Sequence, residues 1–342
     1  GAGGGGAGGS TMSGTSGSSG KICLGDQQID CVPVATCGLE TVAIAKLPPE
    51  ILIVFDKSVS MKDPATGGSC GMPTPCGSKM TEMVNAVSTV VMQTQTSIDW
   101  GLKLFADMGA CGVAVGPTVP VAPMNGAAIS QALSTAAADS HTPTRAGVQA
   151  AVAYLMTLTT PNPKFILLAT DGIPNCIPND KNQINYDQAG ATQAVTDAVT
   201  AGFPVFVLGV GSGVTSNPKD GPIFDPTLTM LATAGGKPRA GTPNYYHASS
   251  NADVVAALGT IQSQVGSCVF NLGKVPPDPT NIAVRGDNNV HIPKDPTHMN
   301  GWDYAAADMK SVKLYGTWCD QVTMGTLKSV QAIFGCPMVI IP

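Results

Sequence analysis

The first two thirds of the chain alternate short, wholly apolar runs with longer segments in which apolar residues recur at helical spacing. The runs ILIVF at 51–55 and FILLA at 165–169 have the continuous apolar character of strands that are buried on both faces. Between them, apolar residues three and four apart predict helices, as in Lys79–Gln95. Strands that alternate with helices predict an α/β fold: a doubly wound, mostly parallel sheet with helices on both faces.

The same pattern predicts the remaining elements of this domain. The segment from His141 to Leu155 opens with hydroxyls and a proline, which favour a helix start, and continues with helical apolar spacing. We expect further strands near Trp100–Ala106, Val113–Val115, Pro204–Val210 and Tyr245–Tyr246, and further helices near Gly126–Ala136, Ala189–Ala201, Pro226–Thr233 and Ala252–Val265.

The pattern changes after Cys268, where turn residues cluster and only short extended runs lie between them. This predicts a small β-rich C-terminal module, 267–342, after an α/β domain at 49–266. A similar extended run, Thr41–Leu47, either joins this module or lies at the edge of the main sheet. The extended runs of the module are Ile282–Arg285, Val290–Ile292, Val312–Tyr315 and Val330–Phe334.

The N-terminal part divides into two segments. Residues 1–20 contain ten Gly and five Ser and no charge, which predicts a flexible tether; the alternative is an artificial linker. Such a tether is similar to the spacer after the lipidated cysteine of bacterial surface lipoproteins, so a lipid anchor upstream of residue 1 is an expectation. Residues 21–48 form a cysteine-containing N-terminal extension.

Composition narrows the choice of compartment and partner. The chain has 18 basic and 23 acidic residues, a net charge of −5 and no basic run, which argues against nucleic acid as a partner. No apolar stretch reaches the roughly 18 residues of a membrane-spanning helix. Ten cysteines without a CxxC pair favour five intrachain disulfides, with a local bridge from Cys70 to Cys76, over zinc. We therefore expect a secreted or outer cell-surface protein.

Candidate chemistry is concentrated where the predicted strands end. Asp56, Ser58 and Ser60 follow the first buried strand, and Asp171 follows the second in the sequence TDG. Thr142 adds a hydroxyl on the loop before a helix. The carboxyl ends of parallel strands meet at one edge of a sheet, where ligands bind in open α/β folds. Carboxylate and hydroxyl oxygens suit a hard cation such as Mg²⁺.

These five residues, in this order, resemble the metal-ion-dependent adhesion site of the von Willebrand factor A family, which includes the integrin I domains. The resemblance covers roughly 49–266. It implies that Mg²⁺, with Ca²⁺ or Mn²⁺ as alternatives, is bound directly by Ser58 and Ser60 and mainly through water by Asp56 and Asp171. Thr142 would bind directly or through water, and Thr144 is a competing choice. A carboxylate from a protein or extracellular-matrix partner would take the sixth position.

A looser resemblance concerns the C-terminal segments CVFNLGKVPPDP, GW and FGCP. They are similar to the region that follows A domains in cysteine-rich secreted proteins of myxobacteria and related bacteria. The tripeptide Arg285–Asp287 reads RGD, but its place between two extended runs favours a turn over integrin recognition.

Two functions remain open. The first is an adhesion protein that uses Mg²⁺ to capture an acidic group on a protein partner. The second is a structural subunit of an extracellular filament, tube or coat, which would self-associate into polymers. We do not expect an enzyme, because no GxxxxGK[ST] phosphate loop is present and the four histidines, at 141, 247, 291 and 298, fall in no catalytic motif.

Overall fold

The computed structural model describes residues 40–65, 77–211, 221–265, 268–323 and 326–335. The expected tether at 1–20, most of the N-terminal extension and the Cys70–Cys76 bridge lie outside these residues. None of the described helices is both long enough and apolar enough to cross a bilayer.

A six-stranded sheet in the order β5–β4–β3–β6–β7–β8 forms the centre of the first domain. Its strands are parallel except for β5, which is antiparallel to β4 at one edge. The predicted fold class, an α/β domain with a mostly parallel sheet, is therefore confirmed. The strands are β3 (Glu50–Asp56), β4 (Asp99–Phe105), β5 (Val119–Ala122), β6 (Lys164–Thr170), β7 (Val205–Val210) and β8 (Tyr246–Ala248).

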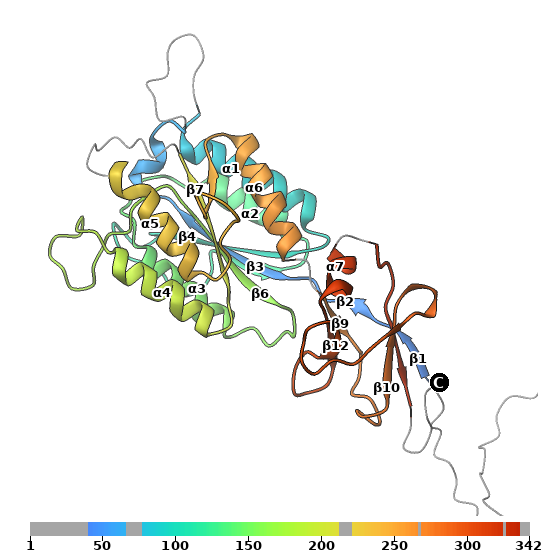
Figure 1. Ribbon diagram of the computed structural model, residues 1–342. Coiled ribbons are helices and arrows are strands. Elements are labelled where there is room, and N and C mark those ends of the chain that lie inside the picture. Colours follow the sequence, from blue (N-terminus) through green and yellow to red (C-terminus); the bar gives the residue numbers. More distant parts are fainter. Residues whose placement is uncertain (1–39, 66–76, 212–220, 266–267, 324–325, 336–342) are drawn as a thin grey trace, which may run out of the picture.

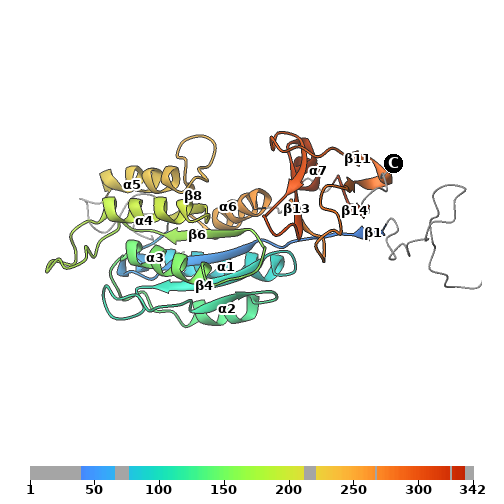
Figure 2. The ribbon, with the colours of Figure 1, turned by 90° about the horizontal axis from the view of Figure 1, so that it is seen from below.

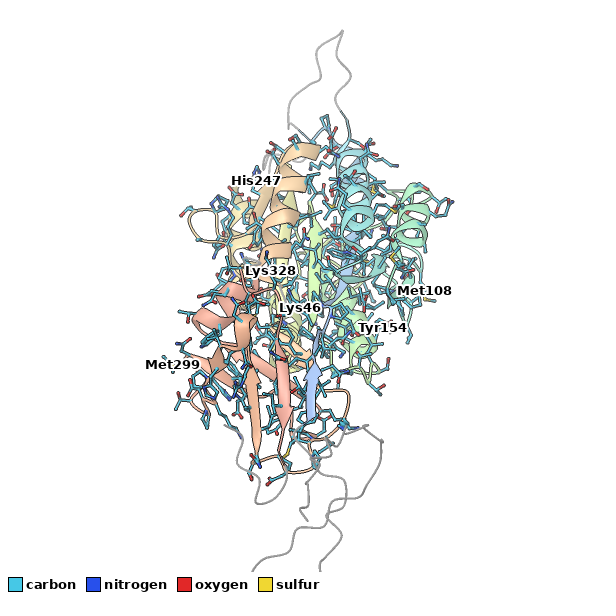
Figure 3. The ribbon with its side chains drawn as sticks, turned by 90° about the vertical axis from the view of Figure 1, so that its right-hand side faces the viewer. Lys46, Met108, Tyr154, His247, Met299 and Lys328 are labelled. Carbon is cyan, nitrogen blue, oxygen red and sulfur yellow. A yellow bond between two sulfur atoms is a disulfide. The ribbon has the colours of Figure 1, made fainter. Side chains whose placement is uncertain are left out.

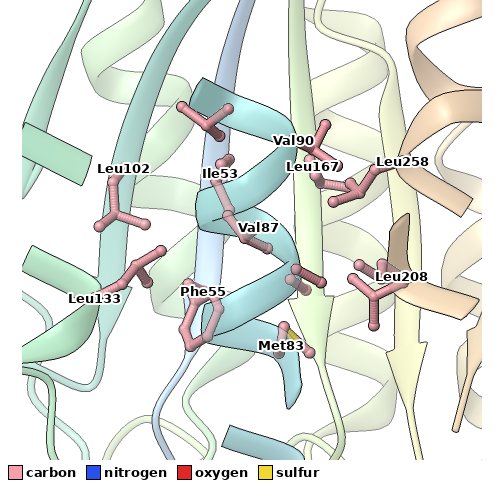
Figure 4. Packing of buried hydrophobic residues seen from close by; sticks show 14 of the residues in the cluster. Ile53, Phe55, Met83, Val87, Val90, Leu102, Leu133, Leu167, Leu208 and Leu258 are labelled. Carbon is pink, nitrogen blue, oxygen red and sulfur yellow. The ribbon is translucent and has the colours of Figure 1, made fainter. Parts of the chain in front are cut away.

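Helices cover both faces of this sheet (Figures 1 and 2). Ile53 and Phe55 of β3 pack against helices on one face (Figure 4), and Leu52 and Val54 pack against helices on the other. Burying one such side chain stabilises the fold by roughly 1.5 to 3 kcal/mol. The first face carries α1 (Lys79–Thr94), α2 (Gly126–Ser134) and α6 (Asn251–Gln264), and the second carries α3 (Thr144–Leu155), α4 (Gln188–Thr200) and α5 (Gly221–Ala234).

Two sequence predictions in this domain were wrong. The segment Val113–Val115 is not a strand. The N–H of Ala114 donates to the Asp107 side chain, and the Lys103 ammonium donates to the carbonyl oxygen of Ala114. The next residue, Val115, is 98% exposed. The edge strand is β5 instead, a few residues later. Helix α5 begins at Gly221, five residues before the predicted start at Pro226.

The C-terminal module consists of two four-stranded antiparallel sheets, ordered β1–β14–β10–β11 and β12–β13–β9–β2. An apolar core that includes Trp302 and Phe334 holds them, and a disulfide joins Cys268 to Cys319. The elements are β1 (Glu40–Ala43), β2 (Ala45–Lys46), β9 (Val269–Asn271), β10 (Ile282–Arg285), β11 (His291–Ile292), β12 (Gly301–Tyr304), β13 (Ser311–Tyr315), β14 (Gln331–Phe334) and α7 (Thr317–Thr323).

The run Thr41–Leu47 joins the module and not the edge of the main sheet. In β1, Glu40 pairs with Phe334, and in β2, Lys46 pairs with Phe270. The chain therefore passes through the module, builds the α/β domain and returns to the module. The module lies at the end of the sheet where β3 begins, and Asp56 lies at the opposite end of that strand (Figure 1).

In the RGD tripeptide, Arg285 ends β10 and Asp287 begins a short 3₁₀ helix, η2 (Asp287–Asn289), so the chain turns here. Both carboxylate oxygens of Asp287 accept backbone N–H groups, of Lys328 and Ser329, at 2.8 Å. The Ser329 hydroxyl also donates to Asp287, at 2.6 Å. This carboxylate is used within the module, as the turn interpretation expects.

Candidate metal centre

The carboxyl ends of β3 and β6 meet because the two strands are adjacent and parallel, with Phe55 opposite Ala169. Asp56 ends β3, a short 3₁₀ helix, η1 (Val59–Lys62), follows it, and Asp171 follows β6. Beside these ends lies an open cavity of about 170 Å³. Its lining includes four of the five predicted metal ligands, namely Ser58, Ser60, Thr142 and Asp171.

Three oxygen atoms converge at this cavity. Ser58 Oγ and Ser60 Oγ lie 3.0 Å apart, and Ser60 donates to Asp171 Oδ1 at 3.0 Å. Ser58 Oγ is 3.5 Å from the same carboxylate oxygen. In an octahedral magnesium site with bonds of about 2.1 Å, neighbouring oxygens lie about 3.0 Å apart. The spacing of these oxygens therefore fits such an ion.

Asp56 is wholly buried, and its carboxylate accepts two hydrogen bonds. Its Oδ1 accepts the Ser58 N–H at 2.8 Å, and its Oδ2 accepts the Thr170 hydroxyl at 2.5 Å. Thr170 also accepts the Gly172 N–H, at 3.2 Å. The Thr170 hydroxyl thus connects the Asp56 carboxylate to the loop that follows β6. The sequence places Thr170 beside Asp171, but nothing in the local pattern indicates this contact.

The structure separates the two candidate threonines. Thr142 lines the cavity, and a Cβ added at Gly172 would come within 3.3 Å of its Oγ1 and 3.6 Å of Asp56 Oδ2. Thr144 is the first residue of α3, is fully buried and is not among the residues that line the cavity. Its hydroxyl has no hydrogen-bond partner among the described residues. Thr142 is therefore the better-placed ligand candidate.

A second group of contacts fixes the Thr142 loop. Asn175 Oδ1 accepts the Thr142 N–H at 2.8 Å, and the Asn175 N–H donates to Thr142 O at 3.0 Å. The next residue, Cys176, forms a disulfide with Cys111, which lies in the loop after β4. Because the partners are far apart in the chain, sequence reasoning missed both Asn175 and this pairing.

One cation is already present beside the cavity. Lys79 begins α1, and its Nζ donates to Asp171 Oδ2 at 2.9 Å. Only 1% of this lysine side chain is exposed. Asp171 therefore directs one oxygen to Lys79 and the other to the serine hydroxyls. The helical pattern predicted that a helix begins at Lys79, but nothing in the sequence indicated a role for this side chain.

Burial raises the pKa of both carboxyls. For Asp56, burial and the neighbouring Asp171 charge raise the pKa to about 7. For Asp171, burial raises the pKa, although Lys79 opposes the effect. A divalent cation would stabilise both charged forms, and a set of carboxylate and hydroxyl oxygens suits a hard ion. The residues present thus fit Mg²⁺, and their donor chemistry also admits Ca²⁺ or Mn²⁺.

Comparison with known proteins gives matches only among solved structures. No protein-family model and no curated protein matches the chain. The pilus adhesin SpaC from Lactobacillus rhamnosus GG is 16% identical over 84% of this chain, which spans only 39% of that protein, with a TM-score of 0.45. The vWF domain of the type V pili tip protein Mfa5 from Porphyromonas gingivalis is 12% identical, covers 65% of this chain and 96% of that one, and has a TM-score of 0.45.

A third similar structure is the manganese-loaded TRAP protein from Plasmodium vivax, at 16% identity, with 65% of this chain and 76% of that chain covered and a TM-score of 0.43. With TM-scores below 0.5 these matches carry no argument about this chain, and the fold assignment rests on its own sheet order and helix layers. The resemblance of the C-terminal segments to myxobacterial proteins stays a prediction.

Proposed function

We propose that this chain is an extracellular or cell-surface binding protein whose cavity holds Mg²⁺ and captures a carboxylate on a protein partner. The observation that carries the proposal is the convergence of Ser58 Oγ, Ser60 Oγ and Asp171 Oδ1 at an open cavity. Ser58 and Ser60 would bind the ion directly, and Thr142 directly or through water. Asp56 and Asp171 would act mainly through water. The ion, when bound, supplies an open coordination position that attracts a carboxylate.

The rim of the cavity suits a protein ligand. Val59 and Tyr186 line it and keep 53% and 42% of their surface exposed. Exposed apolar side chains beside a polar centre can contact the partner around its acidic residue. Both β1 and β14 lie in the module at the far end of the molecule, so the cavity faces away from the strands that begin and end the described chain (Figure 1).

We also infer that the cavity binds and does not hydrolyse. The carboxylate and the imidazole among its lining residues belong to Asp171 and His141. Asp171 is committed to Lys79 and Ser60, so it is poorly placed to take a proton from water. A hydrolysis screen with bound Mg²⁺ would contradict this inference if it found turnover that Asp171→Ala abolishes.

The alternative function, a subunit of an extracellular polymer, is supported by the module. The edge strands of its two sheets are β1 and β11 in one sheet and β12 and β2 in the other. Outer strands can pair with strands of another copy. Electron micrographs of the purified protein with and without chelator test this function, since polymers that persist without metal would favour it.

Calorimetric titration with Mg²⁺ tests the adhesion proposal. We expect the protein to bind Mg²⁺ and Asp56→Ala to bind it about 10- to 100-fold more weakly, as is typical when an outer-sphere partner is lost. Asp139→Ala is the matched control, because Asp139 lies near the same loop but pairs with Lys57. An absence of Mg²⁺ binding by the unmodified protein, or equal affinity in Asp56→Ala, would contradict the assignment.

The ligand is tested separately. An array of peptides that carry Glu or Gln at one position should retain the protein only on the Glu peptides and only with Mg²⁺ present. Retention that survives EDTA would show that the metal is not used for capture.

A further inference from the structure

Lys79 occupies a position that is unfavourable for a lysine. Lysine is rarely buried, yet only 1% of this side chain is exposed. It is also the first residue of α1, and a positive charge at a helix N-terminus opposes the helix dipole. Its ammonium lies 2.9 Å from Asp171 Oδ2, within an ion pair that is buried on both sides. Such a pair costs desolvation, so the stability of the fold alone does not account for it.

Two loops lie around this side chain, the one between β3 and α1 and the one after β7. The Lys79 N–H donates to Asp63 O at 2.9 Å in the loop after β3, and Ser78 caps the helix by accepting the Thr81 N–H. After β7, Gly211 has φ +110°, and a Cβ there would lie 2.7 Å from Lys79 Cε. His247, labelled in Figure 3, donates from Nε2 to Gly211 O at 2.7 Å. The lysine stem thus passes beside a glycine whose position is itself fixed.

The charge of the site follows from these residues. When both carboxyls are ionised, as a bound cation favours, Asp56 and Asp171 carry two negative charges and Lys79 one positive charge, so the three sum to −1. A divalent cation changes this sum to +1, whereas the same two carboxylates without a lysine would reach zero. We propose that Lys79 weakens the binding of Mg²⁺ alone and leaves the loaded site positive, so that metal and acidic ligand bind cooperatively. This inference rests on the proposed function.

Cooperativity of this kind is reciprocal. If an anion on the loaded site strengthens the binding of the metal, the metal strengthens the binding of the anion by the same factor. Lys79 also holds Asp171 in place when no metal is bound, through the Nζ–Oδ2 contact. The lysine therefore keeps the site formed and makes its occupation depend on the partner.

The test compares Lys79→Met with the unmodified protein by Mg²⁺ titration calorimetry. Methionine keeps the length of the side chain and removes the charge. We expect the Mg²⁺ dissociation constant to fall by at least about tenfold, because a nearby positive charge is gone. We also expect a lower melting temperature in EDTA, since Asp171 loses its buried partner, and a larger gain on adding Mg²⁺.

The control is Lys103→Met. Lys103 is also 1% exposed and pairs with an aspartate, Asp107, at 2.8 Å, but neither residue lines the cavity. This change should lower stability without altering the affinity for Mg²⁺. If Lys79→Met fails to fold, Lys79→Gln replaces it: glutamine keeps a hydrogen-bond donor for Asp171 without the charge, and the expected direction is the same.

Acetate supplies the second readout. Sodium acetate, compared with sodium chloride at equal ionic strength, should tighten Mg²⁺ binding by the unmodified protein more than by Lys79→Met or Lys79→Gln. A folded variant that binds Mg²⁺ no more tightly than the unmodified protein, or that keeps the full acetate effect, overturns this inference and leaves the proposed function standing. An unmodified protein that binds no Mg²⁺ overturns both.

Discussion

The α/β domain and the β module differ in what they bury. The domain buries charged side chains such as Asp56, Lys79 and Asp171, together with several hydroxyls. Among the described residues of the module, Ser311 is the one polar side chain that is buried, and its core is otherwise apolar. Buried charges contribute little to the stability of a fold, because the free-energy cost of removing them from water offsets their mutual attraction. Apolar side chains of the same volume would stabilise the fold equally well or better.

Several of the buried polar groups of the domain lie close together. Asp56, Ser58, Thr142 and Asp171 gather at one end of the sheet, whereas the middle of β3 is wholly apolar. Departures from the ordinary rules of folding tend to occur at functional sites. The proposed function would account for this cluster in the domain, whereas the module holds its structure by apolar packing and a disulfide.

The largest expected effect on stability follows removal of either of the two disulfides, which can be compared directly. Cys111–Cys176 and Cys268–Cys319 close loops of similar length, with sequence separations of 65 and 51. Replacing either pair by alanine should cost about 4 kcal/mol of unfolding free energy from loop entropy. We expect loss of Cys268–Cys319 to lower the melting of the module alone. Loss of Cys111–Cys176 should also weaken Mg²⁺ binding, because Asn175 holds the Thr142 loop beside that bridge.

Differential scanning calorimetry and Mg²⁺ titration check this pair. Equal Mg²⁺ affinities in the two double variants would show that the cavity does not depend on the bridge beside it, and the functional contrast between the regions would weaken. A single unchanged transition after loss of Cys268–Cys319 would show that the module does not unfold on its own.

Strands with a strong apolar pattern were predicted correctly from the sequence. In the domain, the run ILIVF is apolar throughout and forms most of β3. In the module, Ile282–Arg285 forms β10 with the expected limits. The strands β9 and β12 were missed, since runs of three or four residues between turn residues show no clear period. The run Thr41–Leu47 stayed ambiguous because its partners, β14 and β9, are more than 200 residues away.

In the candidate site, too, contacts between residues close in sequence could be predicted, and contacts between distant residues could not. Ser58 and Ser60 are close in sequence and follow a strand, so the approach of their two hydroxyls could be expected from the chain alone. The role of Lys79 could not be predicted, because the Asp171 carboxylate that it contacts follows β6, 92 residues later in the chain. Only the three-dimensional arrangement of α1 against the end of β6 brings these two charges together.

The two regions should respond to pH in opposite directions when no metal is bound. The folded pKa of Asp56 is about 7, above its ordinary 3.8, so the folded domain binds this proton more tightly than the unfolded chain does. The resulting stability is fully present below about pH 4 and is lost as pH rises through 7, a change of at most about 4 kcal/mol.

Asp295 in the module behaves in the reverse way. Hydrogen bonds from Thr297, and from the N–H groups of Met299 and Asn300, lower its pKa to about 2. Its contribution is therefore present above about pH 4 and is lost as pH falls toward 2. Thermal unfolding in EDTA from pH 3 to pH 8 measures both trends. A domain whose stability rises between pH 5 and 7 without metal would contradict the burial of Asp56 as the cause of its raised pKa.

A smaller effect is expected from Asp287→Ala. The change removes the acceptor of the Lys328 and Ser329 N–H groups, so the melting temperature of the module should fall modestly. Mg²⁺ affinity should stay the same, because Asp287 lies in the module and is not among the residues that line the cavity. Loss of adhesion to integrin-bearing cells in this variant, with the module still folded, would instead revive the recognition function of the RGD sequence.

The smallest effect should follow deletion of residues 1–20. Apart from Met12 and two alanines, this segment is Gly, Ser and Thr, so it offers almost no apolar surface to bury against either region. Neither the transition of the domain nor that of the module should move by a measurable amount in calorimetry, and Mg²⁺ affinity should be unchanged. A clear fall in the module transition alone would mean that these residues stabilise the module, as a donated strand would at β1 or another outer strand. That result would move the balance from a tethered adhesion protein toward a polymer subunit.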